Sequence, residues 1–106
     1  MPKYLLNASY SAEGSKGLMK DGGTKRVNAA RTLVESLGGK LDLVYFAFGE
    51  TDVVAIVDLP DHASAAAASL TIAGSGALSG KITVLLTPEE IDQAARKSPK
   101  YTPPGR

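Results

Sequence analysis

The sequence predicts a single-domain α+β protein, and three observations support this fold class. The chain has 106 residues, which is close to the commonest size of one domain. Segments with the composition of strands alternate with segments whose apolar residues have helical spacing. Glycines and prolines separate these segments, so each element has a clear end. We therefore expect one domain over residues 1–97, followed by a proline-rich tail over residues 98–106.

The first part of the chain predicts a strand and a helix. Residues 4–10 are partly apolar and partly alternate between apolar and polar residues, which is typical of a strand. Four glycines interrupt the region that follows, so we expect residues 11–20 to form at most a short, weak helical turn. Thr24 is the expected N-cap of the first full helix, and Gly38-Gly39 supplies its left-handed stop. The apolar stripe of this helix is Val27, Ala29, Ala30, Leu33, Val34 and Leu37.

Two strands are expected next, over residues 40–48 and 52–59. The residues between them include Gly49-Glu50, and a glycine at the first central position suits a type II′ hairpin turn. The twist of this turn matches the twist of the flanking strands. Pro60 ends the second of the two strands because it has no backbone N–H to donate.

The second half of the chain predicts a helix, a strand and a terminal helix. Asp61 can cap a helix that continues through Leu70 and stops at Gly74-Ser75-Gly76, and residues 81–86 form the fourth strand. Thr87-Pro88-Glu89-Glu90 has a hydroxyl at the N-cap, proline at N1 and glutamate at N3, which is a capping box. The order is therefore β-α-β-β-α-β plus a helix. This is the ferredoxin-like arrangement, with helices on one face of a four-stranded antiparallel sheet.

The predicted strands carry apolar side chains on both faces, although a sheet with one face in water should alternate. In the third strand, Val54 and Ile56 lie opposite Val53, Ala55 and Val57. In the second strand, alternation places Val44, Phe46 and Phe48 on one face and Leu41, Leu43, Tyr45 and Ala47 on the other. Each exposed large apolar side chain forfeits about 1.5–3 kcal/mol, against a total stability of about 5–15 kcal/mol. We expect a second copy of the sheet to cover this face, in a homodimer or an assembly of dimers.

Composition and charge argue against several classes of function. Twelve basic and eleven acidic residues leave a net charge of +1, and the basic residues are scattered, so we expect no binding to nucleic acid. The chain has no cysteine and one histidine, so we expect no metal site and no cofactor. No apolar run reaches the about 20 residues that span a bilayer, and the N-terminus lacks the layout of a secretory signal. We therefore expect no membrane partner and a cytoplasmic location.

Short motifs that together resemble one known family extend over nearly the whole chain. They are Ser11–Gly14, Lys16–Leu18, Gly22–Thr24 with Arg26, Val34–Lys40, Tyr45–Gly49, Asp52–Val54, Leu59–Asp61 and Leu86–Glu90. Together they resemble the GYD-domain family, small bacterial proteins usually grouped with the dimeric α/β-barrel folds. Of its Gly-x-Tyr-Asp signature the chain has Gly49 and Asp52, whereas Thr51 stands where the tyrosine would be. The resemblance implies a barrel dimer and no particular activity. Any role that the signature tyrosine has in the family is not carried over to this chain, because Thr51 has no phenol group.

Four residues are candidates for binding a ligand: Asn7, Lys16, Tyr45 and Asp52. Asn7 is an amide inside an apolar strand, where a buried amide needs partners. In some dimeric-barrel oxygenases a strand asparagine contacts substrate, and a structural amide is the alternative. Asp52 begins a strand and points, by alternation, to the face of Tyr45, unless it closes the turn by hydrogen bonds to backbone. Lys16 could meet an anion beside backbone donors, or it is an ordinary surface lysine.

Two other features do not predict a site. Residues 76–81 superficially resemble a phosphate loop, but Ser75 and Ile82 stand where the Walker pattern needs glycine and a hydroxyl residue. This segment also leads from a helix into a strand, which is the reverse of that loop. His62 should lie on the exposed first turn of its helix, and no residue near it in sequence supplies the second polar group that a ligand or base needs.

Two hypotheses of function follow from these observations. The first is a binding or assembly module, a barrel dimer that holds a small organic ligand between sheet and helices, because no nucleophile, base and orienting residue converge. The second is a cofactor-independent enzyme, an oxygenase or isomerase for a small aromatic or keto substrate, with Asn7, Tyr45 and Asp52 as polar groups. A deep pocket that brings these three side chains together would favour the enzyme.

The tail carries three prolines, which keep it from extending a helix or joining a central strand. Tyr101 offers a large ring with a polar tip, a side chain that often anchors interfaces. We expect the tail to lie across the molecule or its partner with Tyr101 inserted, and a solvated end is the alternative.

Overall fold

The protein is described by a computed structural model that covers residues 1–47 and 49–106. Within these residues the chain forms a four-stranded antiparallel sheet and four helices. The elements are β1 (Lys3–Tyr10), α1 (Ala12–Asp21), α2 (Gly23–Ser36), β2 (Lys40–Phe46), β3 (Val53–Asp58), α3 (His62–Gly74), β4 (Leu78–Leu85) and α4 (Pro88–Lys97). The strand order is β2-β3-β1-β4, which is compatible with the ferredoxin-like arrangement. The predicted α+β class is confirmed.

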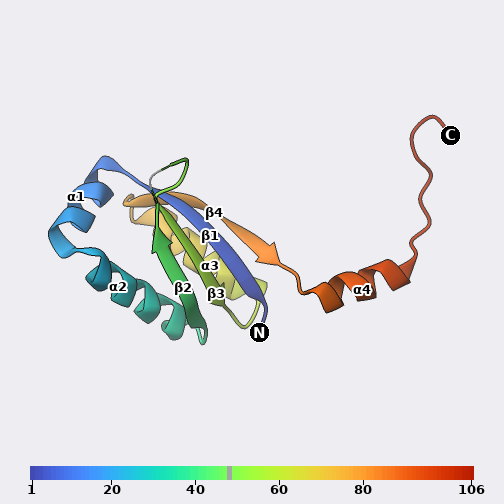
Figure 1. Cartoon of the computed structure of the whole chain (residues 1–106), viewed down its shortest axis with the longest axis horizontal. Helices are drawn as coiled ribbons and strands as arrows, with labels where there is room; N and C mark the ends of the chain where they lie inside the picture. Colours follow the sequence, from blue (N-terminus) through green and yellow to red (C-terminus); the bar gives the residue numbers. More distant parts are fainter. Residues whose placement is uncertain (48) are drawn as a thin grey trace.

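The sheet has one face covered by helices and one open face. In Figure 1, α3 lies behind the sheet, and the face toward the viewer carries no helix. The core lies on the covered side, where Tyr4 and Leu59 are fully buried and Val34, Val57 and Ala65 join them in one cluster. The interior of the chain therefore lies between the helices and this face of the sheet.

An irregularity in β2 changes which residues face the core. The pairing of β2 with β3 shifts between Leu41 and Leu43, as a β-bulge does. As a result Leu41, which pairs with Val57, packs against the core, on the same side as Val44. The prediction that Leu41 shares a face with Leu43 and Tyr45 is wrong, because simple alternation fails at an extra residue. The placement predicted for Phe48 lies outside the described residues.

The segment expected to be a weak turn is the ten-residue helix α1. The Ser11 hydroxyl caps this helix by accepting a hydrogen bond from the Gly14 N–H at 3.0 Å. Gly14 is buried, and a Cβ atom there would collide with the Ala77 carbonyl oxygen. The prediction was wrong because this glycine serves close packing and does not break the helix. Gly22, with φ of 83°, then separates α1 from α2.

The helix α2 begins two residues earlier than expected. Its N-cap is Gly22, which makes no side-chain capping bond, so Thr24 lies inside the first turn and is not the cap. The positive φ of Gly22 lets α2 follow α1 directly, and this leaves no room for Thr24 as a flanking residue. The expected stop is confirmed, because Gly38 has φ of 81° just beyond the helix.

The ends of β2, β3 and β4 also differ from those predicted from the sequence. The ladder of β2 and β3 ends at the pair Phe46 and Val53, and the Ala47 N–H donates to the Asp52 carbonyl at 2.8 Å. The predicted type II′ turn contains Phe48 and so lies outside the described residues. Strand β4 begins at Leu78, earlier than expected, because pairing with Tyr10 of β1 extends it toward the helix.

The two predicted polar caps in the second half are confirmed. The Asp61 carboxylate accepts a hydrogen bond from the Ser64 N–H at 2.7 Å, at the start of α3. At the start of α4, Thr87 Oγ1 accepts from the Glu90 N–H at 3.1 Å, and Glu90 Oε1 accepts from the Thr87 N–H at 3.0 Å. Both bonds of the capping box are therefore present.

Helix α4 and the tail extend away from the body of the molecule (Figure 1). Every residue from 86 to 106 is exposed, and the molecule measures 57 × 33 × 22 Å. The tail therefore does not lie across its own chain, and docking on a partner stays a prediction. Among the helices that the structure describes, none has the length and apolar character to cross a membrane.

Candidate ligand-binding site

A cavity of about 130 Å³ lies between the sheet and the helices, and we call it the apolar cavity. Its lining residues are Leu6, Tyr10, Arg26, Val27, Ala29, Ala30, Leu33, Val44, Phe46, Val53, Ala55, Ile72 and Leu78. Most of these side chains are aliphatic or aromatic. A dry engineered cavity of roughly 150 Å³ with a similar lining binds benzene. The apolar cavity therefore has room for a group of about that size.

Two residues give the apolar cavity its polar character. Tyr10 ends β1, and Arg26 lies in the first turn of α2. Both residues also line a second cavity of about 130 Å³ at the junction with α1, together with Glu13, Asp21 and other residues of that helix. The apolar cavity thus adjoins a cavity with acidic residues in its lining, and Tyr10 and Arg26 belong to both.

The fold holds these two residues through backbone contacts. The Tyr10 N–H donates to the Asp52 carboxylate at 2.9 Å, and Asp52 donates its own N–H to the Ala8 carbonyl at 2.9 Å. Asp52 therefore ties the end of β1 to the start of β3. The first turn of α2 packs closely on β2, because a Cβ atom on Gly23 would lie only 3.2 Å from the ring of Phe46. Arg26 belongs to this turn, so its backbone position is fixed by the packing of α2 on β2.

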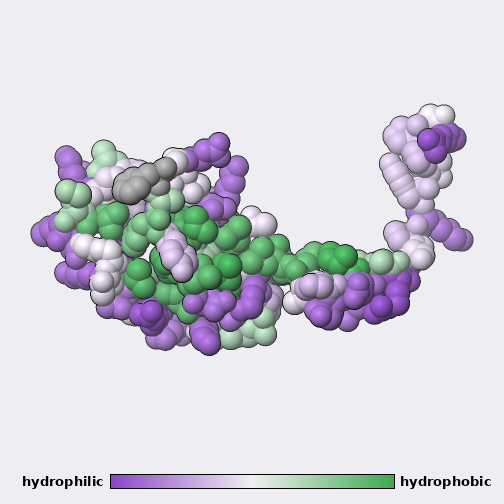
Figure 2. All heavy atoms as spheres, viewed as in Figure 1, coloured by the Kyte–Doolittle hydropathy of each residue, from purple (hydrophilic) through white to green (hydrophobic). Residues whose placement is uncertain are grey.

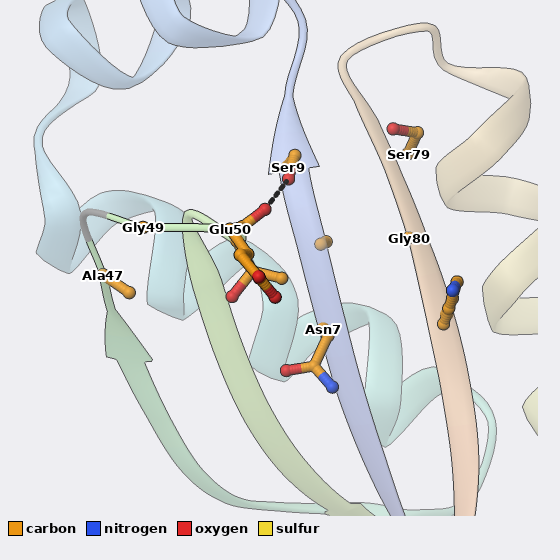
Figure 3. Close-up of a pocket in the computed structure, with 10 residues that line it drawn as sticks. Asn7, Ser9, Ala47, Gly49, Glu50, Ser79 and Gly80 are labelled. Carbon is orange, nitrogen blue, oxygen red and sulfur yellow. Dashed lines mark hydrogen bonds between the residues drawn. The ribbon is translucent and has the colours of Figure 1, made fainter.

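A wide cleft of about 870 Å³ lies on the open face, beside the connection between β2 and β3. Its lining residues are Asn7, Ala8, Ser9, Ala47, Gly49, Glu50, Thr51, Ser79, Gly80 and Lys81. Figure 3 shows Ser9 beside Glu50, whose carbonyl oxygen accepts from the Ser9 hydroxyl at 3.4 Å. This cleft is polar and open to solvent, in contrast to the apolar cavity.

The residues predicted as sites fall in different places. Asn7 lines the open-face cleft, with Gly49 and Thr51 of the signature. Tyr45 is 69% exposed on the open face, next to Val54.

Asp52 lines neither cavity, and its carboxylate is bonded to the Tyr10 backbone. Lys16 is exposed on α1 and lines none of these cavities. The three residues assigned to the enzyme hypothesis, Asn7, Tyr45 and Asp52, therefore do not surround a common pocket.

Sequence reasoning missed Tyr10 and Arg26 as site residues. The signal for Arg26 was its spacing, since Arg26, Ala29, Ala30 and Leu33 recur at the positions that share one helix face. A cation on the apolar face of a helix is unusual and could have been noticed. The signal for Tyr10 was its position in the strand. Alternation places Tyr10 on the same face as Tyr4 and Ala8, both of which are buried, so Tyr10 also faces the helices.

Charged side chains outside the apolar cavity form ion pairs at two separate places. Lys3 Nζ lies 2.9 Å from Asp58 and 3.1 Å from Asp42, and these hydrogen bonds raise the pKa of the Lys3 amine above 10.5. Lys25 Nζ lies 3.6 Å from Asp21. Within the described part of the chain, no three His, Asp or Glu side chains are grouped so that they could hold a metal ion.

The fold and the cavity define a small α+β protein with an apolar pocket between its sheet and helices. The chain belongs to the GYD domain family, because the family model matches residues 4–95. The match extends from β1 into α4 and stops before the tail. A comparison with curated proteins finds no match.

Proposed function

We propose that this protein is a homodimeric module that binds a small organic molecule in the apolar cavity. The main observation that supports the proposal is the apolar cavity between the sheet and the helices. Protein interiors are close-packed, with few voids larger than a water molecule, and each missing contact weakens the core. An apolar pocket with a few polar groups is the usual form of a small-molecule site. A ligand would restore the contacts that the lining side chains lack.

The open face of the sheet supports a dimer. Leu43 and Tyr45 of β2 are exposed there, and Leu5, Val54 and Ile56 lie beside them only half-buried. Figure 2 shows that hydrophobic atoms dominate the middle of this face. Contiguous exposed apolar patches mark interaction sites in soluble proteins. In the proposed dimer, the open faces of two copies pack together as in a dimeric α/β barrel.

Helix α4 supports the same arrangement. Leu86 and Ile91 are 58% and 52% exposed, and Ala94 and Ala95 follow Ile91 on one side of the helix. In Figure 2 the hydrophobic surface continues from the sheet along the connection to α4. Isolated helices shorter than about 12–15 residues are marginal in water, so a ten-residue helix whose residues are all exposed needs a packing partner. The second copy, which covers the adjoining sheet face, provides that partner.

Native mass spectrometry of the gently purified protein tests both parts of the proposal. We expect a mass near twice the 11.0 kDa of one chain, plus a small adduct. The variant Ala30→Leu fills part of the apolar cavity and should lose the adduct but keep the dimer. A monomer at micromolar concentration would contradict the dimer. A dimer that carries no adduct, and that binds no small aromatic probe, would contradict the ligand-binding role.

The enzyme hypothesis gains no support from the geometry. Its three polar residues, Asn7, Tyr45 and Asp52, would have to act on one substrate. Asn7 lines the open-face cleft, whereas the Asp52 carboxylate is engaged by the Tyr10 N–H. Binding without chemistry is therefore the function that the arrangement favours.

A further inference from the structure

We propose that the ligand of the apolar cavity is a small organic monocarboxylate, with its apolar body in the cavity and its carboxylate at Arg26. This inference rests on the proposed ligand-binding function and specifies the chemical class of the ligand. It follows from the charges of the lining residues, from the acidic residues of the neighbouring cavity and from the volume of the apolar cavity.

Arg26 is the one charged residue among the described residues that line the apolar cavity. It is half-buried, and among the described residues its side chain makes no ion pair and no hydrogen bond. The nearby carboxylate of Asp21 pairs with Lys25 instead. A guanidinium remains protonated and presents a planar fork that matches a carboxylate with two parallel hydrogen bonds. A carboxylate ligand would therefore neutralise this cation, which an uncharged apolar ligand would leave without a partner.

Tyr10 provides a second polar contact at the same end of the cavity. Its N–H is held by Asp52, which fixes the backbone from which the ring projects. In the described part of the chain its hydroxyl makes no hydrogen bond, whereas the hydroxyl of the buried Tyr4 does. A phenolic O–H can donate to a carboxylate oxygen beside the guanidinium.

The acidic residues of the adjoining cavity limit the charge of the ligand. Glu13 and Asp21 line it together with Arg26 and Tyr10. These carboxylates would repel a second negative charge on a ligand that extends past Arg26. The arrangement therefore favours a monoanion over a dicarboxylate or a phosphate. The cavity volume of about 130 Å³ limits the apolar body to roughly the size of one benzene ring.

Three probes that share one phenyl ring and differ in charge test the inference: benzoate, benzamide and benzylamine. Binding to the full-length protein is measured by calorimetry and by amide chemical shifts. We expect benzoate to bind roughly tenfold or more tightly than benzamide, the gain typical of a charge-assisted hydrogen bond. Benzylamine should bind weakest. Phthalate, a dicarboxylate, should bind less tightly than benzoate.

Arg26→Gln should remove the preference for benzoate over benzamide and leave the affinity for benzamide unchanged. Arg26→Lys should keep part of the preference, because it retains the charge but not the fork. The matched control is Arg31→Gln on the same helix, where the guanidinium bonds Asn28 at 2.8 Å and does not line the cavity. Circular dichroism establishes that each variant folds.

The outcomes distinguish this inference from the function on which it rests. If benzoate and benzamide bind equally, and Ala30→Leu abolishes both, the cavity is a ligand site but the monocarboxylate class is wrong. An unchanged preference in Arg26→Gln would also overturn the role of Arg26. If none of the probes binds the wild-type protein, the monocarboxylate class is wrong. If the purified dimer also carries no adduct, the ligand-binding role fails as well.

Discussion

The hydroxyl of Tyr4 lies 2.7 Å from Nδ1 of His62, and this contact joins the start of β1 to the first turn of α3. The two rings meet edge to face, with centroids 5.8 Å apart. Tyr4 is only 1% exposed, so its polar tip needs a partner, and His62 supplies one from the surface. His62 was expected to lack a polar neighbour near in sequence. Its partner is 58 residues away.

The Tyr4–His62 contact should contribute measurably to stability. We expect Tyr4→Phe to cost about 0.5–1.5 kcal/mol, because the exposed His62 can then bond water. His62→Ala should cost about 1–3 kcal/mol, since it leaves a buried hydroxyl without its partner. Urea unfolding of both variants and of the double variant measures the coupling. Strictly additive costs would show that the two side chains do not interact.

Two glycines of α1 should respond in opposite directions to alanine. A Cβ atom at Gly14 would collide with the Ala77 carbonyl and lie 3.0 Å from the Tyr10 ring, so Gly14→Ala should cost about 1–3 kcal/mol. No atom lies within 4 Å of a Cβ atom at Gly17. Gly17→Ala should therefore stabilise the protein by about 0.5–1 kcal/mol through the helix propensity of alanine. Thermal melting compares the two, and a loss of stability in both would refute the packing argument.

The cap of α3 should contribute to the acid sensitivity of the protein. The backbone N–H of Ser64 lowers the pKa of the Asp61 carboxyl below 3.8. A carboxyl with a lowered pKa in the folded state stabilises the protein above its unfolded pKa, and this contribution is lost as the pH falls through the folded value. The decline should therefore begin near pH 3.8 and continue below it.

Asp61→Asn is the matched variant for this effect, because asparagine caps helices about as well but does not titrate. It should be close to wild type at neutral pH and lose less stability in acid. Asp61→Ala should be less stable at every pH. Urea midpoints between pH 2 and pH 7 test this, and equal acid sensitivity of wild type and Asp61→Asn would exclude a role for the Asp61 charge.

A charge on the open sheet face should weaken the proposed dimer. Tyr45→Lys places a cation on the edge strand β2, beside the apolar side chains of this face, and we expect a loss of about 2 kcal/mol or more in association, as at an aromatic anchor of an interface. The control is Met19→Lys on α1, because Met19 is 87% exposed and lies on a different surface. Light scattering over a concentration series measures dissociation. A dimer that tolerates Tyr45→Lys would place the interface elsewhere.

Removal of the tail should weaken the dimer and leave the monomer unaffected. Truncation after Lys97 deletes Tyr101, which is 67% exposed, together with the rest of a tail that extends away from the body. We expect a lower melting temperature and weaker dimerisation in the wild-type background. In the monomeric Tyr45→Lys background, the same truncation should not change the melting temperature. If neither quantity changes in either background, the tail is a solvated end.

The sequence by itself determined the features that depend on neighbours within one helical turn. The caps at Asp61 and Thr87 and the stop at Gly38 were correctly predicted, because each is a hydrogen bond or a backbone angle set by residues three or four positions apart. The order of the elements other than α1, and the likeness to the GYD domain family, were also available from the sequence.

The tertiary structure alone decided the features that depend on contacts between distant segments. Leu41 turns inward because of the pairing of β2 with β3, and Gly14 allows a helix to pack where isolated glycines predict a break. The apolar cavity brings Tyr10 of β1 beside Arg26 of α2, two residues that no local pattern connects. Such arrangements depend on strand register and helix packing, whose energies arise between residues far apart in the chain.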